Sequence, residues 1–350
     1  MRSLTAEFLS KLRFNATHAA TLRALGEFRG KQALFFQQPP EVLKSLRQVA
    51  IIESSESSNR LEGVTVAASR LKAIVIKQTQ PRDRSEQEIA GYRDALSLIH
   101  ESAQHMPFNP NVVLQLHKTL YRYMPAPGGR WKSTDNDIIE RHANHSVRVR
   151  FKPVPAHLAE IAMNDLTGAY SAALHDGHQD PLVLLPLAIL DFLCIHPFSD
   201  GNGRIARILT LMLLYHFNYE VGRFISIERV YEESKESYYE TLETSSQGWH
   251  AGRHDVFPWL EYFWGVLLRV YREFEERVGN IRVGRGAKTE QVRQTVLARR
   301  QPFSISEIEA ACAGVSRDTI RAVLRQLKRE GFIVSTGKGR SAKWRAAGNG

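Results

Sequence analysis

The chain has 350 residues, of which 43% are hydrophobic and 24% charged, and its formal net charge is +10. These proportions are ordinary for a soluble globular protein, and the length allows two or three domains. Two distant cysteines, Cys194 and Cys312, exclude a disulfide framework and fit the reducing cytoplasm. The N-terminus lacks a secretory signal, and the most apolar stretch, 182–195, is shorter than the roughly 20 residues that span a bilayer, so we expect no membrane contact.

Most of the chain is predicted to be helical, because apolar residues recur at helical spacing and Gly and Pro cluster between the segments. The predicted helices cover 42–59, 85–100, 110–121, 156–174, 182–195, 203–217, 234–246 and 257–278. The segment 131–151 breaks this pattern. Within it Val147–Phe151 alternates with period two, as an exposed strand does, and 137–139 can pair with it. We therefore predict a mainly α protein with a two-stranded β-hairpin.

The positive charge lies mainly at the C-terminal end. Residues 283–350 hold 14 Lys or Arg and 5 Asp or Glu, whereas residues 1–282 hold 33 and 32. Helix-capping serines and apolar spacing predict three short helices and a basic β-wing after a linker, the layout of a winged helix-turn-helix. Such a domain suggests contact with DNA, although basic residues also simply keep a small domain soluble.

The segment His196–Arg207 is predicted to bind phosphates. Pro197 ends an apolar helix, and Gly201 and Gly203 let backbone N–H groups turn toward one point before the next helix begins. A glycine-containing loop at a helix N-terminus is a ready site for a phosphate.

The charged side chains of this loop suit nucleotide chemistry. Arg204 and Arg207 lie one turn apart and can reach several phosphate oxygens. Asp200 offers a carboxylate for Mg²⁺, and His196 is the group in the loop suited to act as a general base near neutral pH.

The twelve residues from His196 to Arg207 resemble the signature of the Fic (Fido) family, His-x-Phe-x-Asp/Glu-Gly-Asn-Gly-Arg-x-x-Arg, at every defined position. The family transfers AMP from ATP to a Ser, Thr or Tyr hydroxyl of a protein and releases pyrophosphate. The resemblance implies that His196 takes the proton of the hydroxyl and that Asp200 holds Mg²⁺. It also implies phosphate contacts from the rest of the signature, namely Gly201, Asn202, Gly203, Arg204 and Arg207.

The resemblance divides the chain into four parts. They are an N-terminal helical region (1–108), a Fic catalytic core (109–278), a linker (279–287) and a winged helix-turn-helix (288–350).

Two further sites are implied by the same family. The predicted hairpin corresponds to a flap that holds the target segment by strand addition, here through Ile139, Glu140, Arg141 and His142. Tyr238 and Tyr239 resemble the segment that contacts the nucleoside, although packing of their own helix also accounts for two tyrosines.

A second motif, Ser58-Asn59-Arg60-Leu61-Glu62-Gly63, resembles an inhibitory pattern of brake-bearing Fic proteins. It implies that Glu62 pairs with Arg207, assisted by Ser58 and Gly63. An arginine that is paired with a carboxylate cannot hold the γ-phosphate of ATP, so this pairing is expected to inhibit the enzyme.

Three functions follow as alternatives. The first is an autoinhibited protein adenylyltransferase that modifies a target protein or itself. The second is removal of AMP by the same site, and the third is a DNA-binding regulator whose Fic core senses nucleotide. Release of the brake by a change in a homodimer, by a partner or by self-modification is open.

Overall fold

The structure is a computed structural model that describes residues 2–36, 38, 40–141, 147–283, 287–297, 299, 302–312, 315–336 and 343–347. It has two compact units, Met1–Phe274 and Glu275–Gly350, and the boundary falls within helix α12 (Phe257–Val283). None of the described helices is long and apolar enough to cross a membrane.

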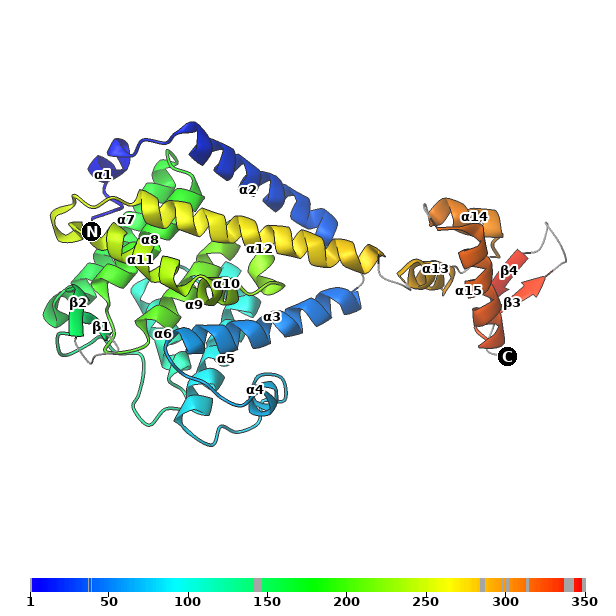
Figure 1. The fold of residues 1–350 in the computed structure, drawn as a ribbon, viewed down its shortest axis with the longest axis horizontal. Helices are drawn as coiled ribbons and strands as arrows, with labels where there is room; N and C mark the ends of the chain where they lie inside the picture. Colours follow the sequence, from blue (N-terminus) through cyan, green and yellow to red (C-terminus); the bar gives the residue numbers. More distant parts are fainter. Residues whose placement is uncertain are drawn as a thin grey trace. The chain divides into compact units, whose positions relative to one another are not determined.

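The first unit is a bundle of helices with one β-hairpin (Figure 1). Its other α-helices are α1 (Ala6–Lys11), α2 (Ala16–Phe35), α3 (Pro40–Leu61), α4 (Ala68–Val75), α5 (Arg84–Ser102), α6 (Pro110–Leu120), α7 (Ala159–Asp176), α8 (Pro181–Ile195), α9 (Asn202–His216), α10 (Ile227–Glu233) and α11 (Lys235–Ser246). Single 3₁₀ turns lie at η1 (Ala103–His105), η2 (Ala156–Leu158), η3 (Val221–Arg223) and η4 (Trp249–Ala251).

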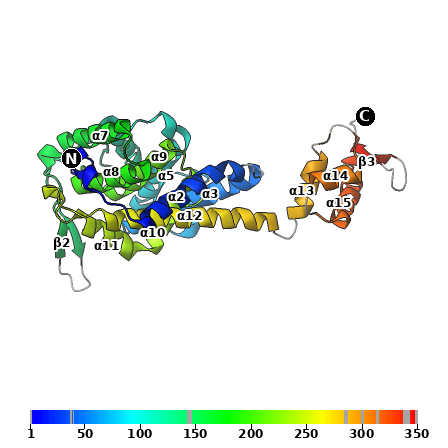
Figure 2. The same cartoon turned by 90° about the horizontal axis from the view of Figure 1, so that it is seen from above.

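Every helix predicted in this unit is confirmed within a few residues, but α1, α2, α4 and α10 were not predicted. The longest of them, α2, contains Gly26 and Gly30 and has no clear apolar stripe. Most of its surface is exposed. Tertiary contacts hold it along α12, where His18 bonds Glu261 and Gln32 accepts from the Tyr271 hydroxyl. Figures 1 and 2 both show α2 (blue) beside α12 (yellow).

Helix α8 is buried on all sides and carries the site. Asp180 caps its N-terminus and Pro181 occupies the first turn, where a missing N–H costs nothing. Pro186 cannot donate to the carbonyl of Leu182, and the indole N–H of Trp264 donates to that carbonyl instead, at 2.8 Å. The helix therefore keeps its polar groups satisfied in an apolar core.

The predicted hairpin is confirmed as β1 (Ile138–Arg141) paired antiparallel with β2 (Val147–Phe151). Ile139 pairs with Val149 and Arg141 with Val147, with an irregularity after Ile138. Only the backbone is described for Glu140 and Arg141, and His142 lies outside the described residues.

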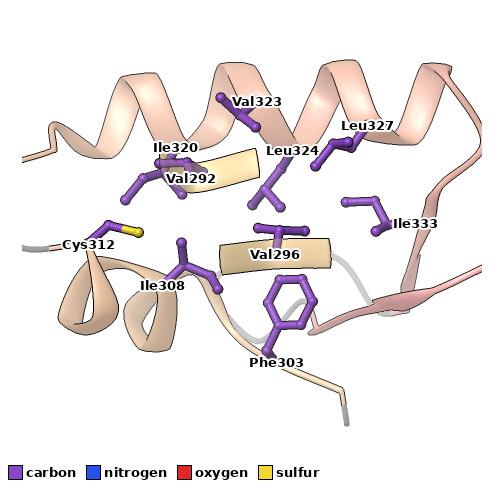
Figure 3. Close-up of a cluster of buried hydrophobic side chains, with 10 residues drawn as sticks. All are labelled: Val292, Val296, Phe303, Ile308, Cys312, Ile320, Val323, Leu324, Leu327 and Ile333. Carbon is purple, nitrogen blue, oxygen red and sulfur yellow. The ribbon is translucent and has the colours of Figure 1, made fainter. Parts of the chain in front are cut away.

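The second unit contains α13 (Ala287–Leu297), α14 (Ile305–Ala311), α15 (Arg317–Arg329) and the antiparallel pair β3 (Ile333–Thr336) and β4 (Lys343–Ala346). Its core gathers side chains from these helices and from β3 (Figure 3). They are Val292, Val296, Phe303, Ile308, Cys312, Ile320, Val323, Leu324, Leu327 and Ile333. Ser304 caps α14 and Ser316 caps α15. Helix α12 continues to Val283, beyond its predicted end at 278.

Candidate active site

The loop between α8 and α9 is shaped by two left-handed residues and a buried ring. His196 ends α8 with a φ of 50°, and Pro197 prevents the helix from continuing. Gly201 has a φ of 84°, a conformation in which other side chains are strained. Phe198 is fully buried and stacks on His117 with ring centroids 3.8 Å apart. The chain's own packing therefore fixes the backbone of the loop.

Asn202 holds the loop with both ends of its side chain. Its Oδ1 accepts the N–H of Phe198 at 2.9 Å, and its Nδ2 donates to the carbonyl of the same residue at 2.7 Å. Both contacts give the side chain a structural role in the loop, and its phosphate contact stays a prediction. Its backbone N–H, in the first turn of α9, is what can face an anion.

His196 is placed to accept a proton. Its Nδ1 lies 3.3 Å from the carbonyl oxygen of Leu193, and because a carbonyl only accepts, Nδ1 carries the hydrogen and Nε2 keeps its lone pair. Burial lowers the pKa of His196 to about 4. The positive charge of Lys132 lowers this pKa further, whereas the hydrogen bond to the Leu193 carbonyl raises it. The imidazole is therefore neutral near pH 7, as a general base must be.

Asp200 offers the loop's carboxylate to a ligand, since its side chain is 59% exposed. Partial burial opposes ionisation, but Arg204, the Tyr121 hydroxyl and the Gly201 N–H together lower the pKa of Asp200. Among the described residues no three acidic, His or Cys side chains gather into a metal cage. One ionised carboxylate fits Mg²⁺, which is usually shared between one or two carboxylates and substrate phosphates.

Arg204 is held within the protein. Its Nη1 lies 2.5 Å from Oε2 of Glu88 on α5, its Nη2 lies 3.4 Å from Asp200, and its side chain is only 3% exposed. The ion pair with Glu88 is buried and joins the loop to α5, and the phosphate contact of Arg204 stays a prediction.

We expect Arg204→Ala to lower the free energy of unfolding by about 2 kcal/mol, because Glu88 would remain buried with only the exposed Arg84 as its partner. Urea denaturation followed by circular dichroism measures this change. Arg84→Ala is the matched control and should cost about 1 kcal/mol or less. Equal stability of Arg204→Ala and the wild type would rule out this role.

Arg207 is bound by the motif that ends α3. Its Nη2 lies 2.7 Å from Oε1 of Glu62 and 2.8 Å from the carbonyl of Ser58, and its Nε donates to the Ser58 hydroxyl at 2.8 Å. Burial works against the charged form, but Glu62 and nearby tyrosines raise the pKa of Arg207, so the guanidinium stays charged. Gly203 lets the Glu62 carboxylate come close to the start of α9, since a Cβ at this position would lie 2.4 Å from Oε1 of Glu62. Gly63, just beyond the pair, has a φ of 82°.

These groups surround a cavity of about 200 Å³. His196, Gly203, Arg207 and Glu62 all line it, so the structure brings the two motifs together. Tyr238 and Tyr239 on α11 also line it, while the Tyr239 hydroxyl donates to the carbonyl of Leu61 at 3.2 Å. The hairpin contributes Ile138, Arg150 and Phe151, and α8 contributes Leu190, Leu193 and Cys194.

Residues 107–214 match the sequence model of the Fic/DOC family. The chain contains a Fic/DOC domain. Two curated proteins, both called protein adenylyltransferase Fic, are each 24% identical to the chain. The one from Nematostella vectensis aligns over 59% of this chain and 44% of its own length, and the one from Drosophila willistoni over 69% and 45%. The chain thus spans less than half the length of these relatives.

Solved structures share the fold of this chain. A Fic family protein from Desulfovibrio desulfuricans G20 aligns over 97% of this chain and 98% of its own, with a TM-score of 0.62 and 21% identity. A Fic domain protein from Bacteroides thetaiotaomicron aligns over 73% and 97%, with the same score and identity. Fic-1 from C. elegans aligns over 75% and 72%, with a TM-score of 0.58 and 18% identity.

Sequence reasoning missed several residues that support the Fic/DOC loop. His117 bonds the carbonyl of Asp200 at 3.1 Å, and Lys132 donates its N–H to the carbonyl of Pro197 at 2.8 Å. Asn136 donates to the carbonyl of Phe198 at 3.2 Å. No signal in the sequence identifies these contacts. For Glu88 the sequence does hold a signal, because an acidic residue within the apolar face of a predicted helix implies a buried cation as partner.

Proposed function

We propose that this protein transfers AMP from ATP to a hydroxyl side chain of a protein. The observation that carries the proposal is the neutral, partly buried His196, which lines the same cavity as Gly203 at the start of α9 and the charged Arg207. The names of the curated relatives, protein adenylyltransferase Fic, support this reaction.

In the proposed step, Nε2 of His196 accepts the proton of the acceptor hydroxyl. The hydroxyl oxygen forms a bond to the α-phosphorus of ATP while the bond from that phosphorus to the bridging oxygen breaks, and pyrophosphate leaves. The loop around Gly201 and Gly203 offers backbone N–H groups to the phosphates, and Asp200 would hold Mg²⁺. When bound, Mg²⁺ neutralises charge on the phosphates. Placement of the reactants and stabilisation of charge account for most of the rate.

The contact between Glu62 and Arg207 supports autoinhibition. Arg207 is the signature arginine whose charge lies in the cavity, and Glu62 occupies it at 2.7 Å. A γ-phosphate needs the same donors, so ATP and the Glu62 carboxylate compete for one guanidinium. The wild type should therefore have low activity until Glu62 moves.

ATP labelled at its α-phosphate tests the reaction against other phosphate transfers. The proposal predicts that this label enters protein, whereas label at the γ-phosphate appears in pyrophosphate. If protein acquires the γ-label instead, the reaction is phosphorylation and the proposal fails.

The shifted pKa of His196 sets the expected dependence on pH. A group whose pKa is lowered in the folded protein stays unprotonated until the pH falls to that value, here about 4 rather than 6.5. The rate of AMP transfer should thus be nearly constant from pH 8 down to about pH 5. Single-turnover rates against pH measure this, and a loss of activity centred near pH 6.5 would indicate an exposed histidine.

Removal of AMP is the alternative reaction at the same site. The observation that supports it is that Glu62 lines the cavity. There Glu62 would orient a water molecule and His196 would protonate the leaving hydroxyl. Incubation of an AMP-modified protein with the wild type, followed by measurement of free AMP, separates the two directions. Release of AMP by the wild type and not by Glu62→Gly would favour removal.

The second unit supports a further proposal, that it is a winged helix-turn-helix that binds DNA. Helix α15 buries its apolar side and exposes basic residues, and two strands follow it. The exposed basic residues of α15 are Arg317, Arg321, Arg325, Lys328 and Arg329. Binding to labelled duplex DNA should weaken steeply as salt rises. In Arg321→Ala the affinity should fall less steeply with salt. Absence of binding at low salt would make this unit a protein-contact module.

A further inference from the structure

The hairpin presents different side chains on its two faces. Residues paired across the ladder share a face, and neighbours along a strand alternate. Ile139, Val147 and Val149 therefore lie on one face, and they are 40%, 51% and 44% exposed. Arg148 and Arg150 lie on the other face, which is turned toward α11. The alternation of Val and Arg in β2 thus separates an apolar outer side from a charged inner side.

Both arginines contact one carboxylate. Glu243 on α11 accepts from Nη2 of Arg148 with one oxygen, and from Nε and Nη2 of Arg150 with the other, at 2.7 and 2.6 Å. Arg150 also donates to the carbonyl of Tyr239 at 3.3 Å and lies over its ring. The Glu243 side chain is only 17% exposed, so water screens these pairs less than it would at an open surface.

Other contacts of the hairpin lie near its base. A two-stranded hairpin is marginally stable by itself, and Ile139, Val147 and Val149 on the outer face of this one are largely exposed. At the end of β2, Phe151 stacks on His250 with centroids 5.3 Å apart, which fixes the base of the hairpin. Figure 2 shows β2 beside α11. The side-chain contacts between them include those of Arg148 and Arg150 with Glu243. Gln247, just after α11, donates to the carbonyl of Arg150 at 3.5 Å.

This attachment lies at the cavity. Arg150 and Glu243 line it together with His196 and Arg207. A shift of β2 away from α11 would therefore move one wall of the cavity relative to the catalytic histidine.

We propose that Glu243 is a positioning residue that holds β2 over the cavity through Arg148 and Arg150, and thereby sets where an acceptor hydroxyl meets His196. The second half of this inference rests on the proposed function. The first half, the attachment of the strand, does not.

Hydrogen–deuterium exchange tests the attachment without any reaction. In Glu243→Gln the amides of residues 147–151 should exchange about tenfold faster than in the wild type, because the strand opens more often. Arg148→Gln should raise the rate in the same direction but less, since Arg150 remains. Glu240→Gln, on an exposed position of the same helix, is the matched control and should leave exchange unchanged. Unchanged exchange in both Glu243→Gln and Arg148→Gln overturns the proposal, and Arg148→Gln decides it if Glu243→Gln does not fold.

The effect on the reaction is measured in proteins that also carry Glu62→Gly. With ATP labelled at its α-phosphate, Glu243→Gln should lower the ratio of protein-bound AMP to free AMP by about tenfold. Free AMP forms when water accepts the AMP group, and a misplaced hydroxyl competes poorly with water. Binding of a fluorescent ATP analogue should change by less than about twofold. Weaker binding with an unchanged ratio would make Glu243 a nucleotide contact and contradict the proposal. If none of these proteins transfers AMP, the proposed function fails, and the exchange result alone judges the attachment.

Discussion

Glu62→Gly is expected to raise AMP transfer by about 10- to 10²-fold over the wild type. Arg207 is 2% exposed and its Nη2 is held by Glu62 at 2.7 Å. Removal of this carboxylate leaves a buried cation without its counter-charge, and a phosphate of ATP can then restore the balance. A hydrogen bond to a charged group contributes roughly 1.5–3 kcal/mol, and each 1.36 kcal/mol corresponds to a factor of ten in rate.

The geometry also explains why the freed arginine should stay in place. Ser58 still accepts from Nε with its hydroxyl and from Nη2 with its carbonyl, both at 2.8 Å. Incorporation of label from α-labelled ATP measures the gain. Glu56→Gln is the matched control, because Glu56 on the same helix pairs with Arg60 at 3.2 Å. An equal gain in both variants, or none in Glu62→Gly, would refute autoinhibition through Arg207.

His196→Ala is expected to have the opposite effect. In the Glu62→Gly background it should lower the rate of AMP transfer by about 10²- to 10⁴-fold, the usual contribution of a placed general base. Binding of ATP should change by less than about twofold, since the proposed site holds the phosphates through α9 and Arg207. Quenched-flow rates and equilibrium binding of a fluorescent ATP analogue measure the two quantities.

A surface histidine provides the control for that loss. His178 is 82% exposed, and His178→Ala should leave the rate unchanged. A comparable loss of ATP binding in His196→Ala would mean that the residue shapes the loop rather than accepts a proton.

The elements of the site that could be predicted from sequence are local ones. The loop from His196 to Arg207 follows from a proline, two glycines and the apolar helices on either side. Its left-handed conformation at Gly201 and its buried Phe198 follow from the same short stretch. The hairpin was predicted because the alternation in β2 is also local.

The roles that could not be predicted depend on partners far along the chain. The carboxylate that holds Arg204 is 116 positions away, on α5, and spacing within the signature does not reveal it. The amide of Asn202 could equally face a ligand or its own loop, and only the fold decides. Helix α2 escaped prediction because it is held by contacts with α12 and not by an apolar stripe of its own.

The central claim is AMP transfer to a protein hydroxyl through His196. Its most direct test is mass spectrometry of proteins after Glu62→Gly enzyme is incubated with ATP and Mg²⁺ in a cell lysate. We expect AMP attached to Ser, Thr or Tyr side chains, and none when His196→Ala is added to the same enzyme. Consumption of ATP without any AMP-modified protein, or equal modification in the presence and absence of His196, would contradict it.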